Sequence, residues 1–279
     1  MSSEETPPKI VDVAALSNPE WRDLALAKEL LENPGLAARF AAVLGSPIER
    51  GFKMLPANWT GTLNKAVRSA LFRALDVAVG TLSRKPQSIS SQRWHKILVG
   101  ASGGLGGAFG LAALPLELPV STTIMLRSIA DIARSEGHDL NDINTKLNCL
   151  EVFAFGGRGS SIAATESAYW AARTALSQTV AEATSYIARR GMIERTAPAV
   201  ARFIAAISSR FGVIVSEEIA AKAVPIVGAA GGAVINVLFM DHFQNIARGH
   251  FIVRRLEKVH GLDAIRAAYN SILIPDKTL

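Results

Sequence analysis

Six glycines fall within eleven residues of an uncharged stretch that runs from Ile97 to Leu116: Gly100, Gly103, Gly104, Gly106, Gly107 and Gly110. Read as a helix, they cover one face spanning roughly 160°. Such a face is nearly bare backbone, so it can lie unusually close to another helix or to lipid. A second uncharged run, residues 223–240, also contains glycines. We therefore expect close helix packing at Gly100, Gly103, Gly104, Gly107, Gly110, Gly228 and Gly232.

The composition favours helices over strands. The chain has 279 residues, of which 49% are hydrophobic but only 6% aromatic, so its apolar mass is mostly Ala, Leu, Ile and Val. Strand-like alternation is sparse. The sequence predicts an all-α protein, a compact multi-helix bundle with two Gly/Ala-rich helical hairpins. We expect residues 1–45 to form a helical lead-in and residues 46–279 the main helical domain.

Local signals predict several helix boundaries. Ser17 and Glu20 make a capping box for a helix ending near Glu32. A core-facing amphipathic helix is expected from Thr60 or Thr62 to about Ser83, with these residues on one side: Leu63, Ala66, Val67, Ala70, Leu71, Ala74, Leu75 and Ala78. Further helices are predicted to open at Ser121, after Asp139 and near Asp263. Residues 200–211 form another amphipathic segment.

The first glycine run also resembles the cofactor loop of short-chain dehydrogenases, with Gly100, Gly104 and Gly106 in the phosphate-binding places. That loop normally follows the first strand of its domain, whereas about ninety helical-looking residues come before it here. No second strand ending in a ribose-binding acid follows. We expect no cofactor. The single cysteine, Cys149, lies in an apolar run typical of a packed thiol.

Polar residues accompany both glycine runs. Beside the first, the sequence places Glu117, Arg127 and Asp131, and Glu117 can pair with Arg127 or lie in an exposed loop. Asn236, Asp241 and His242 stand near the second run. Hydrogen bonds between packed helices explain these better than metal binding, because no His-x-x-x-His spacing occurs. The sequence contains no nucleophile elbow, and the spacing of its polar residues assigns no catalytic residue.

The charge balance suits an anionic partner. The net charge is +6, and Arg254, Arg255 and Lys258 follow the second run. Cations beside apolar helices are typical of docking to anionic lipid, although a solvated face has the same pattern. Interleaved aromatics are missing, so nucleic acid is not expected. The acidic, polar N-terminus is unlike a signal peptide, which predicts a cytoplasmic protein.

Two segments together resemble the bacterial EcsC family. The first is Ala113-Leu-Pro-Leu-Glu-Leu-Pro-Val-Ser-Thr-Thr with Arg127-Ser-Ile-Ala-Asp; the second is residues 225–236 followed by Phe239-Met-Asp-His-Phe and Arg255-Leu-Glu-Lys-Val-His-Gly. The family takes its name from a member encoded beside an ABC transporter concerned with secretion, and no agreed catalytic residues can be transferred from it. The resemblance implies a role accessory to transport or secretion, with an ABC transporter as partner.

We therefore expect a helical protein, peripheral to the inner face of the cell membrane, that binds lipid or the membrane surface. One alternative is a peptidase-like hydrolase that uses Glu117, Asp241 and His242 in a cleft. Another is a soluble scaffold that binds a transporter subunit.

Overall fold

The computed structural model describes residues 16–32, 36–45, 48–82, 114–156, 167–191, 193–224 and 228–273. Within these ranges every regular element is a helix, which confirms the predicted all-α class. The elements are α1 (Asn18–Glu32), α2 (Leu36–Leu44), α3 (Glu49–Lys53), α4 (Trp59–Thr81), α6 (Leu114–Ser135), α7 (Ile143–Glu151), the 3₁₀ turn η3 (Val152–Ala154), α8 (Ala168–Arg190), α9 (Pro198–Ala223), α10 (Gly228–His260) and α11 (Leu262–Ser271).

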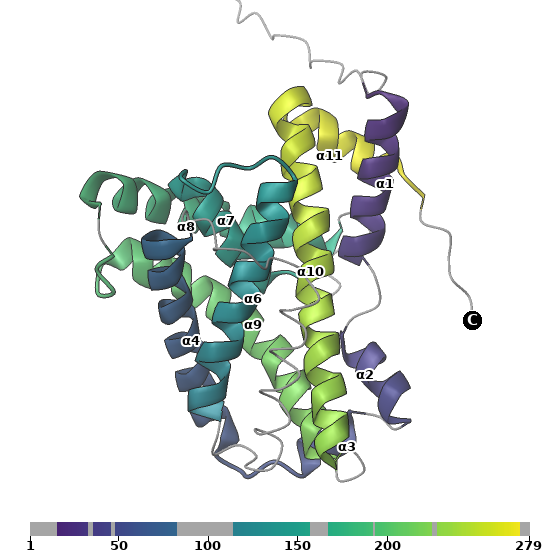
Figure 1. The fold of residues 1–279 in the computed structure, drawn as a ribbon, viewed down its shortest axis with the longest axis vertical. Coiled ribbons are helices and arrows are strands. Elements are labelled where there is room, and N and C mark those ends of the chain that lie inside the picture. Colours follow the sequence, from purple (N-terminus) through teal and green to yellow (C-terminus); the bar gives the residue numbers. More distant parts are fainter. Residues whose placement is uncertain are drawn as a thin grey trace, which may run out of the picture.

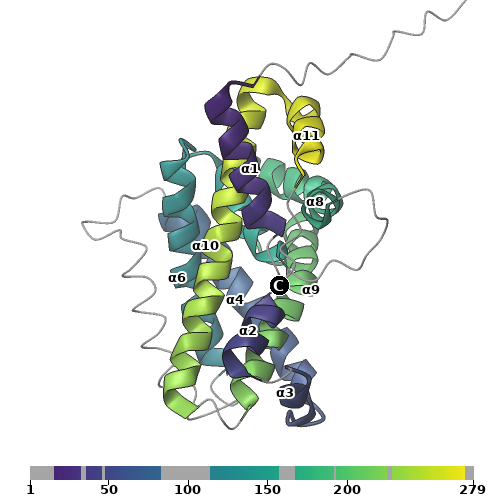
Figure 2. The same ribbon diagram turned by 90° about the vertical axis from the view of Figure 1, so that its right-hand side faces the viewer.

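The longest helix, α10, runs along the whole bundle and is about 50 Å long at 1.5 Å per residue. Helices α1 and α6 lie along it, and α9 crosses behind (Figures 1 and 2). One end of the molecule, at the bottom of both views, gathers α3, the first turns of α4, α6 and α10, and the last turn of α9. We call this the lower end.

The first helix follows its sequence signal closely. The Glu20 carboxylate accepts hydrogen bonds from the Ser17 amide (2.8 Å) and the Ser17 hydroxyl (2.7 Å). This satisfies an amide that a helix N-terminus would otherwise leave free. Helix α1 then packs along α10 and buries Leu24, so part of the expected lead-in belongs to the bundle.

The predicted apolar faces are confirmed. All eight residues expected on the inner side of α4 are buried there, between α6 and α9. On α9, Val200, Phe203, Ile204, Ile207 and Phe211 are fully buried.

The predicted start of α6 was wrong. The helix begins at Leu114, not at Ser121, and contains Pro119. Pro115 stands in the first turn, where its missing N–H has no intrahelical partner to lose. Pro119 loses one hydrogen bond, but Leu114 and Leu118 are buried on the same side and offset that cost.

Helices α7 and α10 also differ from expectation. Asp142, and not Asp139, caps α7 by accepting from the Asn144 and Thr145 amides. The second glycine run and the segment through Phe251 form one continuous helix, α10, which begins at Gly228 and buries Gly232. Gly100, Gly103, Gly104, Gly107 and Gly110 lie outside the described residues, and the two glycine-rich hairpins are not confirmed.

One close approach fixes the lower end. A Cβ at Gly51 of α3 would stand 1.8 Å from the Ala220 carbonyl oxygen of α9. The two backbones therefore touch directly, and only glycine fits between them. This contact holds the short α3 against the last turns of α9.

Candidate functional site

Glu117 links the two halves of the chain at the lower end. It stands in the first turn of α6, where a carboxylate is favoured by the helix dipole, instead of in a turn between helices. Its carboxylate pairs with Lys222 of α9 at 3.2 Å, and Lys222 also pairs with Glu218 at 2.9 Å. The three side chains are between 9% and 19% exposed, so the triad is largely desolvated.

The triad combines one cation with two carboxylates. Burial raises the pKa of Glu218, although Lys222 opposes the shift. For Lys222, burial alone would lower the pKa, but the two carboxylates outweigh it and raise the pKa. Lys222 therefore stays charged and holds α6 to α9.

Arg127 and Asp131 take other partners. Arg127 donates to the Thr81 hydroxyl at 3.3 Å, and Asp131 pairs with Arg134 at 2.6 Å. The pairing of Glu117 with Arg127 that the spacing allowed is therefore replaced by the pairing of Glu117 with Lys222.

The register of α6 against α10 separates Glu117 from Asp241 and His242. Gln244 donates to Ser128 at 2.8 Å, and Arg255 donates to Glu136 at 3.2 Å, so the two helices run parallel. Glu117 precedes Ser128 by eleven residues and so lies level with residues near 233 of α10. Asp241 and His242 stand roughly 12 Å further along the axis. The Glu/Asp/His cleft of the hydrolase alternative is not assembled.

His242 is a packing residue between α10 and η3. It is 6% exposed, and its Nε2 lies where a Cβ on Gly156 would come within 2.4 Å. Burial, with a smaller contribution from Arg39, lowers its pKa to about 4, so the ring is neutral at pH 7. Asn236 is buried on the same helix, and Asp241 is half-buried.

The cations expected to meet lipid have partners within the chain. Arg254 donates to Asn148 at 2.7 Å, and Arg255 bridges Asp23 at 2.8 Å and Glu136 at 3.2 Å. Lys258 lies 3.1 Å from His138 Nδ1. An anionic headgroup would have to compete with these contacts, so other cations are better placed to meet it.

The lower end presents a surface that the sequence analysis missed. Leu116 is 79% exposed, and Met54, Val120 and Val234 are 52%, 50% and 44% exposed. At the same end Arg50 and Lys53 of α3 and Lys65 of α4 are exposed, as is Glu49. The other two carboxylates described there, Glu117 and Glu218, are paired with Lys222. The half-buried rings of Phe52 and Trp59 lie 6.0 Å apart between these cations. Contrary to the expectation from the sequence, aromatic side chains are interleaved with cations here, since Phe52 and Trp59 lie among Arg50, Lys53 and Lys65.

A second polar cluster is buried between α8 and α10. Arg173 makes a two-pronged pair with Glu257 at 2.6 and 3.1 Å, and both side chains are under 10% exposed. Arg173 also donates to the Tyr169 oxygen at 3.3 Å, and the Tyr169 hydroxyl lies 2.9 Å from His250 Nδ1.

The hydrogen bonds and ion pair of this cluster join α8 to α10. Burial lowers the pKa of His250 well below its usual value and raises that of Tyr169. The phenol therefore keeps its proton, and the neutral imidazole can accept a hydrogen bond from it at Nδ1. Burial likewise raises the pKa of Glu151, whose carboxylate lies 4.0 Å from His250 Nε2.

Two features of the described residues concern metal binding and membrane crossing. No group of three or more His, Cys, Asp or Glu side chains is placed to hold a metal ion in this part of the chain. By length and composition, α9 is the one helix in it that could cross a membrane. Yet α9 packs against α2, α3, α4, α8 and α10, as a core helix does.

Comparison with known proteins decides the family. The model of the EcsC protein family matches residues 20–256, which is most of the chain. The chain belongs to the EcsC family. The matched residues include most of α1 and the lower-end triad of Glu117, Glu218 and Lys222. Searches of curated proteins and of solved structures found no match.

Proposed function

We propose that this EcsC-family protein docks reversibly on the inner face of the cell membrane through its lower end, and binds lipid there. The observation that carries the proposal is the set of exposed aliphatic side chains beside unpaired cations. Among the described residues, Arg50, Lys53 and Lys65 have no ion-pair partner. Elsewhere on the described surface Arg255 is paired, whereas Arg190 and Arg210 form no ion pair, so the exposed aliphatic side chains beside the cations distinguish the lower end.

The magnitudes favour attachment at the surface over spanning. Transfer of one Leu or Val side chain from water into hydrocarbon is worth about 1.5–3 kcal/mol, and each cation near an anionic surface about 1 kcal/mol. Leu116, Val120 and Val234 with three cations can therefore give reversible binding. The aromatic pair Phe52–Trp59 adds rings of the kind that settle at headgroup level.

The triad is compatible with the same orientation. Glu117 and Glu218 would each be repelled by anionic headgroups if they stood alone at this end. Lys222 pairs with both and compensates one of the two negative charges, which weakens that repulsion. An ABC transporter in the same membrane is the partner that we propose for this docked state.

Replacement of Leu116 by aspartate is expected to weaken vesicle binding about tenfold or more, because a charge replaces a side chain that enters the hydrocarbon. The measurement is flotation of the full chain with vesicles made of equal parts phosphatidylglycerol and phosphatidylethanolamine. High salt should release the wild-type protein, since the cations act through screened attraction.

Val259→Asp is the matched control. Val259 is 69% exposed, close to the exposure of Leu116, but stands in the last turn of α10 at the opposite end. It should float as the wild type does. Equal loss in both variants, or a wild-type protein that stays with the soluble fraction, would support the scaffold alternative instead.

A further inference from the structure

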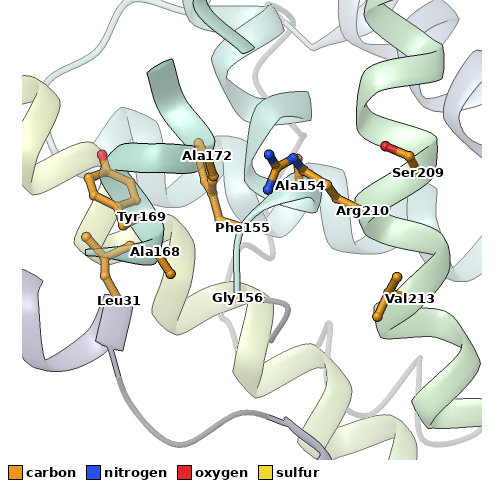
Figure 3. A pocket seen from close by; sticks show the side chains of 10 residues that line it. All are labelled: Leu31, Ala154, Phe155, Gly156, Ala168, Tyr169, Ala172, Ser209, Arg210 and Val213. Atoms are coloured by element: carbon orange, nitrogen blue, oxygen red, sulfur yellow. The ribbon is translucent and has the colours of Figure 1, made fainter. Parts of the chain in front are cut away.

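A cavity of about 150 Å³ opens between α1, η3, α8 and α9, away from the lower end (Figure 3). Its ten lining residues are Leu31, Ala154, Phe155, Gly156, Ala168, Tyr169, Ala172, Ser209, Arg210 and Val213. Most of them are apolar or offer only ring and methyl surface. A cavity of this size holds a molecule with about the volume of benzene.

Arg210 is the one charged residue among those that line the cavity. It is half-buried on α9, and its guanidinium reaches across toward η3, as Figure 3 shows. Among the described residues, no carboxylate lines the cavity and none forms an ion pair with Arg210. The nearby Arg202 on the same helix, in contrast, pairs with Glu182 at 2.6 Å.

The other polar groups at the cavity are already engaged. The Tyr169 hydroxyl is hydrogen-bonded to His250 and Arg173, so Tyr169 contributes its ring to the lining of the cavity. The Ser209 hydroxyl donates to the Ala206 carbonyl at 2.9 Å. Behind Gly156 stands His242, which burial keeps neutral at pH 7. Of the lining residues that the structure describes, Arg210 is therefore the only one that offers a charge.

We infer that this cavity binds a small monocarboxylate whose apolar body is about the size of a benzene ring. The ligand's carboxylate would form an ion pair with the Arg210 guanidinium, and its apolar part would pack against Phe155 and Tyr169. A single guanidinium matches one carboxylate in two parallel hydrogen bonds. A phosphate dianion would need a second cation in such an apolar setting, and the described part of the lining offers none.

Part of the cavity lining is exposed. Val213 is 48% exposed and Ser209 is exposed, both on the outward side of α9. These exposed residues place part of the lining at the described surface, next to Arg210. This inference goes beyond membrane docking and does not depend on it, because none of the lower-end side chains lines the cavity.

The test is a chemical-shift titration of the full chain with benzoate and with its uncharged relative benzamide. Wild-type protein should bind benzoate at least about tenfold more tightly than benzamide, as expected for one charge-assisted bidentate contact. Arg210→Met should remove that preference and leave benzamide binding unchanged, because the substitution keeps the length of the side chain and removes its charge.

Arg202→Met is the matched control, since it removes a cation from the same helix outside the cavity, and it should bind benzoate like the wild type. Leu116→Asp should do the same, which separates this result from the vesicle experiment. Equal affinity of the wild type for benzoate and benzamide would overturn the inference whether or not Arg210→Met folds. Unchanged benzoate binding in a folded Arg210→Met protein would overturn it as well.

Discussion

Replacement of Arg173 by methionine is expected to lower the free energy of unfolding by about 3–5 kcal/mol. The loss comes chiefly from Glu257, which would stay 9% exposed with its charged partner gone. The guanidinium also lies over the rings of Trp170 and Tyr169, 4.9 and 5.6 Å from their centroids. Urea denaturation at neutral pH, followed by circular dichroism, measures the effect.

The double variant Arg173→Met/Glu257→Leu serves as the control for this prediction. It removes both charges and leaves an apolar pair, so much of the lost stability should return. A single variant that costs less than about 1 kcal/mol would mean that the pair is solvated and that α8 and α10 are held together by other contacts.

Truncation of Phe153 to alanine is the second large effect, again about 3–5 kcal/mol. Its ring is fully buried in η3 and lies 5.0 Å from Phe211 and 5.3 Å from Phe243. Removal of the ring leaves a cavity where η3, α9 and α10 meet. The same denaturation experiment applies, with Leu273→Ala as the control, because Leu273 is 90% exposed and should change stability by less than about 0.5 kcal/mol.

Local patterns predicted the helices well. The face of α4 and the Ser17–Glu20 capping box depend on neighbours within one or two turns, and both form as the spacing indicates. The start of α6 was missed because a proline usually ends a helix, and burial of Leu114 and Leu118 outweighed that tendency here. At the start of α6, tertiary packing therefore outweighs the low helix propensity of proline.

The candidate sites were harder to predict, because they depend on pairing across the fold. Glu117 and Lys222 are 105 residues apart, and Arg173 and Glu257 are 84 apart. Nothing in either local sequence says which distant charge will lie opposite. The same is true of Arg255, whose partner Asp23 lies in α1 and whose partner Glu136 directly follows α6. A charge pattern alone cannot separate a free cation from an internally paired one.

Arg210 and the lower-end cations are the opposite case, because the fold gives them no ion-pair partner. Arg50, Lys53 and Arg210 have no distinctive spacing in the sequence. They become candidate binding residues only because the fold leaves them without ion pairs beside apolar surface. The useful sequence signal at the lower end was composition, since residues 50–65 mix cations with Phe52, Met54 and Trp59.

The most direct test of membrane docking uses an environment-sensitive fluorophore on a cysteine introduced at Leu116, compared with one at Val259. The native Cys149 should not react, because it is fully buried and burial raises its thiol pKa. On addition of phosphatidylglycerol-containing vesicles, the label at position 116 should shift to the blue while the label at 259 stays in water. A label at 116 that stays in water, or a blue shift at 259, would contradict docking through the lower end.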